Sequence, residues 1–393
     1  MPGGARIPDN SYLKKGNSAT DYGAVTDTTA NPLGADMRAA VLETIPGELV
    51  IADVRVDKPG PNEVLVRVAA AGLCHSDLHF MEAKYPHKVP AILGHEAAGV
   101  VEAVGDGVTY VKAGDHVISC LSAYCGACDF CLTGRLYLCG NRASIERPGR
   151  LTTSDGELIH QFMRLSAFAE MMLVHEHALV KVTPDMPLDR AALIGCGVTT
   201  GLGAVFRTAR VEPGSTVAII GCGGIGLNVV QGARIAGAGR IIAVDMNDTK
   251  LAMATDFGAT DVINATDTDA IAAVKELTHG GVEYSFEAIG TKVAAEQAFN
   301  MLMSGGTATV IGMIPIGQKV EVDGYQLLAE KKLQGSNMGS NRFRVDMPRY
   351  VDLYLQGRLK LDELVSARID LDHVNEGFAA MKTGTVARSV IMF

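Results

Sequence analysis

Between residues 37 and 119, the hydrophobic residues come in short runs that Pro and Gly separate. These runs span residues 37–42, 49–54, 63–68, 99–105 and 115–119. Short runs rich in β-branched residues between turn-forming residues are typical of strands. We therefore predict that residues 37–197 form an antiparallel, barrel-like domain with irregular loops.

After Gly197, apolar runs that predict buried strands alternate with segments of helical periodicity. The predicted strands are 216–221, 240–245, 261–263, 284–289 and 307–312, and the predicted helices are 225–236, 269–278 and 293–303. Alternating strands and helices indicate a parallel, doubly wound sheet of the Rossmann type. The predicted fold class is therefore α/β, with residues 198–336 as the Rossmann domain.

The pattern changes again near residue 336. Amphipathic periodicity predicts helices over 346–357 and 373–383, and the chain ends in a strand-like run, 388–393. We expect residues 337–393 to return to the first domain. Residues 1–36 are polar and without periodicity, so we expect them to form an N-terminal extension.

Charge and hydropathy argue against two classes of partner. The chain has 35 Lys and Arg against 44 Asp and Glu, a net charge of −9, with no basic cluster. Nucleic-acid binding needs clustered positive charge, so we expect no nucleic-acid partner. We find no apolar run of the ~18 residues that a membrane span needs, and no signal peptide at the start. We therefore expect a cytoplasmic protein that does not bind membranes.

Half of the eight cysteines lie in one segment, in the pattern C-x₂-C-x₂-C-x₇-C. They are Cys125, Cys128, Cys131 and Cys139. Four closely spaced thiolates predict a closed tetrahedral site, so we expect a structural zinc in a lobe over 120–140. Iron–sulfur ligation is the main alternative, although its typical run has a shorter last gap and a proline where Gly140 stands here. Unliganded thiols and disulfides are the remaining alternatives.

A second set of soft ligands is spread along the chain. Cys74, His95 and Cys196 offer two thiolates and one imidazole. Three such ligands form a zinc site whose fourth position stays open to water or substrate, which is typical of catalytic zinc. The sequence therefore predicts two zinc ions per chain, one catalytic and one structural.

A glycine-rich turn, G-C-G-G-I-G, follows a predicted strand and opens a predicted helix. Its residues are Gly221, Gly223, Gly224, Ile225 and Gly226. The G-x-G-x-x-G pattern in this context predicts that pyrophosphate binds at the helix N-terminus. Asp245 ends the next predicted strand, where a carboxylate accepts hydrogen bonds from ribose hydroxyls and repels a 2′-phosphate. We therefore predict NAD rather than NADP as the coenzyme.

Taken together, these motifs resemble the zinc-containing medium-chain alcohol dehydrogenases, of the class I/III-like, dimeric type. The motifs are G-L-C-H-S-D at 72–77, G-H-E at 94–96, G-C-G-V-T-T-G at 195–201, the four-cysteine lobe and the glycine turn. The resemblance covers about residues 37–393. It implies a GroES-like catalytic domain and reversible hydride transfer between a primary or secondary alcohol and NAD.

The resemblance also implies roles for individual residues. It gives catalytic roles to Ser76, His79 and Glu96, and makes Asp77 the hydrogen-bond partner of His95. The implied coenzyme contacts are His75, Thr200, Asp245, Lys250 and Arg388. The residues implied to line the substrate pocket are Phe80, Met81, Tyr85 and Leu121. Such a pocket suggests an apolar aliphatic or aromatic alcohol.

Two other functions stay open. One is oxidation of the glutathione adduct of formaldehyde, because the stretch between Cys139 and Phe168 resembles that of glutathione-dependent relatives. A polar anchor for this adduct is not evident around residues 80–90. The other is a non-catalytic regulator that binds zinc and NAD, which would be expected to lack Ser76, His79 or a zinc ligand. The resemblance further implies a homodimer, paired through the sheet edge near residues 305–320.

Overall fold

The computed structural model describes residues 34–383 and 387–393. The chain divides into two units, Met1–Pro32 and Leu33–Phe393, and the described residues belong to the second. Most of the expected N-terminal extension, residues 1–33, therefore lies outside the described residues. The first strand begins at Ala35, two residues before its predicted start.

The first part of the chain forms two sheets whose strands are mostly antiparallel, as predicted. One has the order β7(Leu151–Thr153), β2(Leu49–Val56), β1(Ala35–Leu42), β4(Ala91–Ile92), β8(His160–Gln161). The other has the order β10(Leu179–Lys181), β6(His116–Ser119), β5(Glu96–Val104), β3(Glu63–Gly72), β18(Arg388–Met392), β17(Val365–Ile369), with β9(Met171–His175) also paired to β3. Because β18 pairs with β3, the C-terminal strand lies in the sheet of the catalytic domain.

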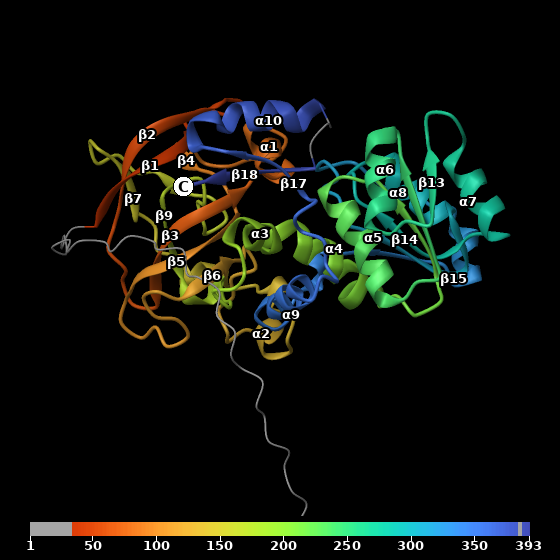
Figure 1. Ribbon diagram of the computed structural model, residues 1–393, viewed down its shortest axis with the longest axis horizontal. Helices are drawn as coiled ribbons and strands as arrows, with labels where there is room; N and C mark the ends of the chain where they lie inside the picture. The colour runs from red at the N-terminus through yellow and green to blue at the C-terminus, as the bar shows by residue number, and fades with distance from the viewer. Residues whose placement is uncertain (1–33, 384–386) are drawn as a thin grey trace, which may run out of the picture. The chain divides into compact units, whose positions relative to one another are not determined.

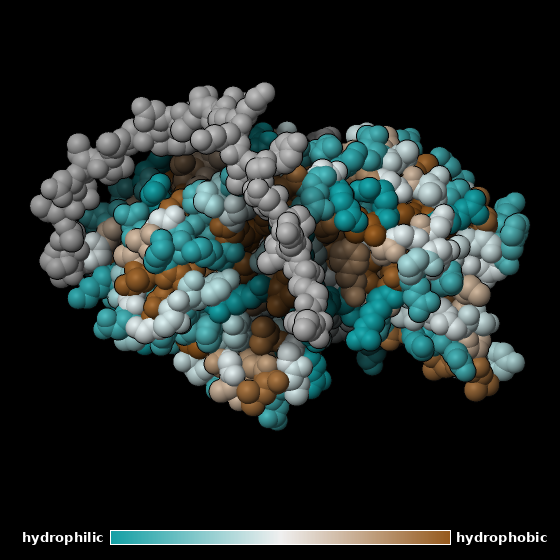
Figure 2. Space-filling view, turned by 60° about the horizontal axis from the view of Figure 1, so that its bottom comes forward, coloured by the Kyte–Doolittle hydropathy of each residue, from teal (hydrophilic) through white to brown (hydrophobic). Residues whose placement is uncertain are grey.

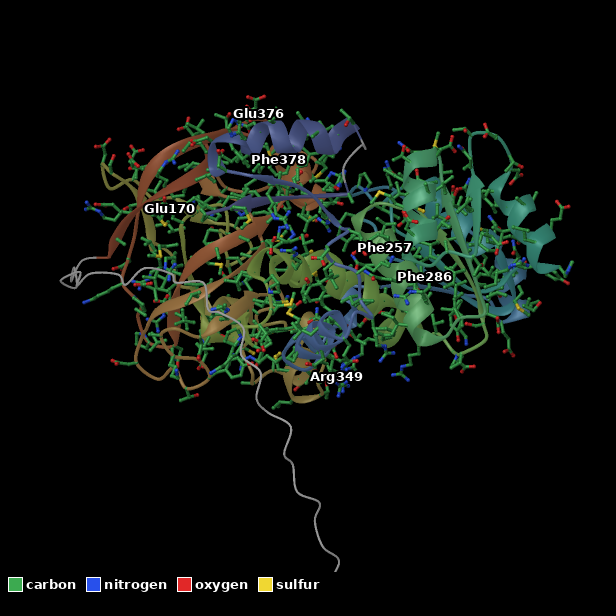
Figure 3. The ribbon with its side chains drawn as sticks, viewed as in Figure 1. Glu170, Phe257, Phe286, Arg349, Glu376 and Phe378 are labelled. Carbon is green, nitrogen blue, oxygen red and sulfur yellow. The ribbon has the colours of Figure 1, made fainter. Side chains whose placement is uncertain are left out.

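The third sheet is parallel throughout, as the alternation of strands and helices predicts. Its order is β13(Asp261–Asn264), β12(Arg240–Asp245), β11(Thr216–Ile220), β14(Val282–Glu287), β15(Leu302–Val310), β16(Lys332–Gly335). The helices that connect its strands are α5(Gly224–Ala236), α6(Asp248–Phe257), α7(Ala270–Thr278) and α8(Lys292–Asn300) (Figure 1). Phe257 and Phe286, labelled in Figure 3, are among the largest fully buried side chains.

Two elements of this domain are absent from the sequence prediction. Helix α6 buries only Leu251, Ala254 and Phe257, a narrow apolar stripe, although Asn247 caps its first turn. The second is strand β16. The predicted sheet edge near residues 305–320 is wrong, because β16 pairs with β15 there. Strand β15 pairs with β14 on one side and with β16 on the other, so the free edge is β16.

A continuous helical segment, Leu188–Ala209, crosses the predicted domain boundary at residue 197. It consists of α3(Leu188–Leu193), α4(Thr199–Gly203) and wider π-helical turns between and after them. By length and composition it could cross a membrane, which corrects the expectation that no apolar run is long enough. Because 83% of its apolar window is buried inside the protein, it is placed as a core helix.

The remaining helices are α1(His75–Met81), α2(Asp129–Leu132), α9(Phe343–Leu355) and α10(Val374–Thr383). Helices α9 and α10 confirm the two predicted near the C-terminus, with α9 starting three residues earlier than expected. Helix α1 was not predicted, and it carries several candidate site residues. On the face seen in Figure 2, hydrophilic residues cover much of the surface, with smaller hydrophobic groups between them.

Candidate active site

The three expected ligands of the open zinc site meet in the interior of the protein. Cys74 directly precedes α1, His95 directly precedes β5, and Cys196 lies in the long helical segment. Their ligand atoms, together with a carboxylate oxygen of Glu96, all lie within 4.8 Å of one another. All four side chains are buried, so the protein has brought two thiols and an imidazole out of water to one point.

The imidazole of His95 has one satisfied and one unsatisfied nitrogen. Its Nδ1 lies 3.0 Å from Oδ1 of Asp77, which also accepts a hydrogen bond from the backbone N–H of Gly94. Its Nε2 is buried and has no hydrogen-bond partner within the described chain. Burial lowers the pKa of His95, but Asp77 and Cys74 outweigh burial and raise it well above its usual value. An orphaned nitrogen beside two thiols, backed by a carboxylate, fits a zinc ligand set.

Replacing Asp77 by asparagine should weaken zinc binding at this site by roughly 10- to 100-fold. The carboxylate orients the imidazole and raises its basicity, and partners of this kind contribute about that factor. Zinc affinity can be measured by competition with a chromogenic chelator. Substituting Asp372, an exposed carboxylate that pairs with Arg38, supplies the control and should leave the affinity unchanged. Unaltered zinc affinity in Asp77→Asn would contradict the orienting role.

Glu96 and Arg388 form a buried pair beneath the cluster. Arg388 Nη1 lies 3.1 Å from Oε1 of Glu96 and donates to the carbonyl oxygen of Leu73 at 3.0 Å. Burial raises the pKa of Glu96 to about 8, against the opposing effect of Arg388. A Cβ added at Gly197 or Gly224 would overlap the guanidinium group. Arg388 therefore reaches the glycine turn, as a pyrophosphate contact must, but its side chain is only about 6% exposed.

The four-cysteine lobe has the dimensions of a closed metal site. Its ligand atoms also lie within 4.8 Å of one another, with Sγ–Sγ distances of 3.5 Å for Cys128–Cys131, 3.8 Å for Cys128–Cys139 and 3.9 Å for Cys125–Cys131. Zinc–sulfur bonds of about 2.3 Å give a tetrahedron with edges of about 3.8 Å. All eight cysteines are free, so the disulfide alternative finds no pair here.

Comparison with known proteins connects these sites to one family. Residues 60–185 match the alcohol dehydrogenase GroES-like domain, and residues 224–356 match the zinc-binding dehydrogenase domain. The class-3 alcohol dehydrogenase of Pisum sativum is 40% identical over 355 residues, which are 87% of this chain and 94% of that protein. The chain belongs to the zinc-containing medium-chain alcohol dehydrogenases. It is accordingly an NAD-dependent oxidoreductase.

Two further relatives within this dehydrogenase family are named after specific substrates. The S-(hydroxymethyl)glutathione dehydrogenase of Saccharomyces cerevisiae is 36% identical over 367 residues, covering 90% of this chain and 95% of that protein. The crystal structure of benzyl alcohol dehydrogenase from Acinetobacter calcoaceticus matches with a TM-score of 0.86 and 34% identity, covering 91% of this chain and 99% of that one.

The glycine turn of this dehydrogenase is closed by the carboxylate predicted to bind ribose. Gly221 has a positive φ of 94°, and a Cβ at Gly226 would overlap the carbonyl oxygen of Gly221. Asp245 Oδ2 accepts the backbone N–H of Cys222 at 2.8 Å, which ties the turn to the end of β12. Helix α5 begins at Gly224, so its free N–H groups face the turn. Lys250 lies in the first turn of α6, after Asp245.

Helix α1 places the predicted proton-transfer residues beside the cluster. Ser76 Oγ lies 3.7 Å from the Cys74 sulfur and 3.4 Å from the sulfur of Met313. The ring of His79 lies 6.1 Å from that of Tyr85, and its Nδ1 is buried without a partner in the described residues. His75, on the same helix, is exposed. These positions agree with the roles that the resemblance implies, which stay predictions.

Aromatic side chains form a wall next to His95. Phe80 lies 5.8 Å from Tyr85 and 4.9 Å from Phe162, and Phe162 lies 6.1 Å from His95, measured between ring centroids. The predicted pocket residues Met81 and Leu121 belong to the same hydrophobic cluster. We call Phe80, Tyr85 and Phe162 the aromatic wall.

Three residues that contact the site, Phe162, Met313 and Met338, were not predicted from the sequence. Phe162 belongs to the aromatic wall, Met313 reaches Ser76, and Met338 places its sulfur 3.8 Å from that of Cys196 and 3.4 Å from Oγ1 of Thr200. No motif marks these positions. Met338 has a positive φ of 50°, which is uncommon for a residue other than glycine. The sequence therefore gives no sign of this backbone conformation.

Replacing His79 by glutamine should slow alcohol oxidation near pH 7 by up to about 100-fold, the low end for general acid–base catalysis. Burial lowers the pKa of His79 below 6.5, so the imidazole is neutral at pH 7 and accepts a proton. Wild-type rates should fall only as the pH drops below that lowered value, and the variant should lack this acidic limb. Rates measured from pH 5 to 10 check this, and an unchanged profile would contradict it.

Proposed function

We propose that this chain oxidises S-(hydroxymethyl)glutathione with NAD⁺, and that it also accepts other alcohols. The observation that carries the proposal is identity over nearly the whole chain: 36% with the yeast S-(hydroxymethyl)glutathione dehydrogenase and 40% with the pea class-3 enzyme. These relatives favour the glutathione-dependent reading over the apolar alcohol that the predicted pocket residues suggest.

The residues around the cluster divide the chemistry of alcohol oxidation. Cys74, His95 and Cys196 would hold a zinc ion, which when bound lowers the pKa of the alcohol as a Lewis acid. The hydroxyl of Ser76 would relay the alcohol proton, taking it up as it releases its own, and the neutral imidazole of His79 would accept the released proton and pass it to solvent, while the hydride goes to NAD⁺. The glycine turn and Thr200 orient the coenzyme against the substrate, which makes the reaction effectively unimolecular. The four-cysteine lobe would hold a second, structural zinc.

A second candidate substrate is an aromatic primary alcohol. The aromatic wall beside His95 supports it, because phenyl rings at 4.5–7 Å stack favourably on one another. The structural match to a benzyl alcohol dehydrogenase points the same way. This substrate needs no charged anchor.

The deciding experiment compares NADH formation at 340 nm with formaldehyde plus glutathione and with benzyl alcohol. A kcat/KM at least tenfold higher for the glutathione adduct supports the proposal. A higher value for benzyl alcohol would replace it with the second candidate. Repeating the assay with NADP tests the role of Asp245, whose carboxylate would repel a 2′-phosphate. Zinc-replete protein that turns over neither substrate would favour a binding protein without turnover.

We also propose a homodimer paired through the free edge of β16. The segment between β15 and β16 exposes Ile316, Tyr325 and Leu328, with 76–80% of each residue accessible. Large apolar side chains beside an unpaired strand edge are typical of protein interfaces. Leu328→Asp should therefore convert the dimer to monomers in sedimentation velocity, while Leu132→Asp, at a position on the four-cysteine lobe that is also largely exposed, should not. A reducing, cytoplasmic compartment remains part of the proposal, because eight free thiols suit it.

A further inference from the structure

Two segments from different domains meet beside Ser76. Helix α1 and the turn after it belong to the catalytic domain, whereas residues 312–315 follow β15 of the Rossmann domain. The hydroxyl of Ser76 donates to the sulfur of Met313 at 3.4 Å, and the hydroxyl of Tyr85 donates to the carbonyl oxygen of Ile314 at 3.0 Å. Met313 therefore lies against the hydroxyl that we expect to relay the alcohol proton.

The backbone of Met313 is also held from the side of the Rossmann domain. Glu287, at the end of β14, is fully buried, and its Oε2 accepts the backbone N–H of Gly312 at 3.2 Å. Gly290 packs so closely that a Cβ at this position would lie 2.8 Å from the backbone N and O of Met313. With Tyr85 bonded to the next residue on the other side, the backbone at Met313 has no room to retreat.

This position of Met313 limits the shape of the alcohol. An alcohol that binds the Ser76 hydroxyl places its reacting carbon beside the Met313 side chain. In a primary alcohol that carbon carries one carbon substituent and two hydrogens, and in a secondary alcohol it carries two carbon substituents and one hydrogen. The aromatic wall offers an apolar surface to one substituent. A second substituent falls against the thioether of Met313.

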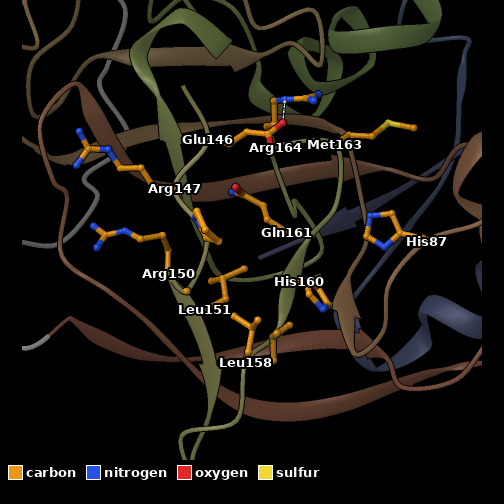
Figure 4. A pocket seen from close by; sticks show the side chains of 13 residues that line it. His87, Glu146, Arg147, Arg150, Leu151, Leu158, His160, Gln161, Met163 and Arg164 are labelled. Atoms are coloured by element: carbon orange, nitrogen blue, oxygen red, sulfur yellow. Dashed lines mark ion pairs between the residues drawn. The ribbon is translucent and has the colours of Figure 1, made fainter. Parts of the chain in front are cut away.

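The cavity shown in Figure 4 lies elsewhere in the catalytic domain. It has a volume of about 360 Å³ and is lined by His87 and by residues between 146 and 164. Neither Ser76 nor Met313 lines it. The cavity therefore gives no room to a second substituent on the carbon that reacts beside Ser76.

We propose that Met313 determines specificity by excluding the second carbon substituent of secondary alcohols, and that Tyr85 is the positioning residue that keeps Met313 in place. Methionine suits this role because its unbranched thioether fills irregular gaps. The inference rests on the alcohol oxidation proposed above, and it names primary alcohols as the substrate class. Both candidate substrates, S-(hydroxymethyl)glutathione and an aromatic primary alcohol, belong to this class.

Two matched pairs of alcohols test the role of Met313. The kcat/KM of zinc-replete enzyme is measured from NADH formation with benzyl alcohol against 1-phenylethanol, and with 1-octanol against 2-octanol. We expect the wild type to prefer the primary alcohol of each pair by about 100-fold, within the range for one carbon that a pocket does not accommodate. Met313→Ala should lower this preference at least tenfold, by raising kcat/KM for the secondary alcohol.

Two further methionine variants separate side-chain volume from other effects. Met313→Leu conserves the volume and should keep the preference within about threefold of the wild type. Met303→Ala removes a side chain of the same size from β15 of the same domain, where Met303 is 41% exposed. It should leave the preference unchanged.

Tyr85→Phe tests the positioning role, because it keeps the ring in the aromatic wall and removes only the hydroxyl. Losing one hydrogen bond should lower the preference for primary alcohols roughly fivefold. In the Met313→Ala background the same change should have no further effect, because Tyr85 acts through Met313. Tyr110→Phe is the control, since its hydroxyl also bonds to the backbone, at the N–H of Lys181, and its loss should leave the preference unchanged.

The outcomes distinguish this inference from the proposed function. Equal kcat/KM values for the two alcohols of each pair in the wild type, or an unchanged preference in Met313→Ala, would overturn the inference and leave alcohol oxidation in place. A full effect of Tyr85→Phe in the Met313→Ala background would refute the positioning role of Tyr85. Oxidation of neither these four alcohols nor the glutathione adduct would overturn the proposed function as well.

Discussion

Cys196→Ala should reduce kcat/KM for alcohol oxidation by at least about 10³-fold. A metal ion can lower the pKa of a bound oxygen from about 16 to about 7, and nine units correspond to roughly 12 kcal/mol. A 10³-fold loss of rate corresponds to about 4 kcal/mol, which is only a third of the roughly 12 kcal/mol that the metal ion could contribute. With Cys196 gone, only one thiolate and one imidazole remain among the three expected ligands, which is too few to retain zinc at this position.

Metal analysis separates this effect from a loss of fold. Elemental analysis should find two zinc ions per chain in the wild type and one in Cys196→Ala, because the four-cysteine lobe is untouched. Cys120→Ala is the matched control, since Cys120 is equally buried but belongs to neither cluster. It should keep both zinc ions and full activity. Two zinc ions and normal turnover in Cys196→Ala would show that Cys196 is no ligand.

The parallel sheet could be predicted because its strands bury both faces and therefore appear as continuous apolar runs. Helix α6 was not predicted, because it lies on the surface and buries only every third residue, so its apolar periodicity is weak. The helical segment Leu188–Ala209 was also not predicted, for the opposite reason. It is buried on nearly all sides, so it shows no polar face, and its glycines disfavour helix unless packing holds them.

Some residues of the candidate site could likewise be predicted from the sequence, and others could not. The zinc ligands and the glycine turn could be predicted because their chemistry demands fixed residue types at fixed local spacings. Phe162, Met313 and Met338 could not, because any apolar side chain of suitable size can fill such a contact. Their positions follow from tertiary packing that joins segments far apart in the chain, and so does the burial of Arg388.

At pH 9, above the pKa of about 8 of Glu96, where the carboxylate is ionised, Arg388→Met should destabilise the protein by about 3–5 kcal/mol, the usual cost of breaking a buried ion pair by removing one partner. Sequence resemblance assigns Arg388 to the pyrophosphate. The structure gives it a second role, because its guanidinium lies against Glu96 and donates to the carbonyl oxygen of Leu73. Without it, the buried carboxylate loses its ion-pair partner and the carbonyl its donor. Methionine keeps much of the hydrocarbon volume, so the loss reports on charge more than on packing.

A double-mutant cycle with Glu96→Gln separates the two roles of Arg388. Urea unfolding should show that Glu96→Gln/Arg388→Met is more stable than Arg388→Met alone, because the unpaired carboxylate is gone. Coenzyme affinity, measured by quenching of NADH fluorescence, should stay low in both variants if the guanidinium also contacts the pyrophosphate. Recovery of both properties in the double variant would limit Arg388 to the pair with Glu96. Wild-type stability in Arg388→Met would instead show that Glu96 is protonated there, as its raised pKa of about 8 allows, and needs no partner cation.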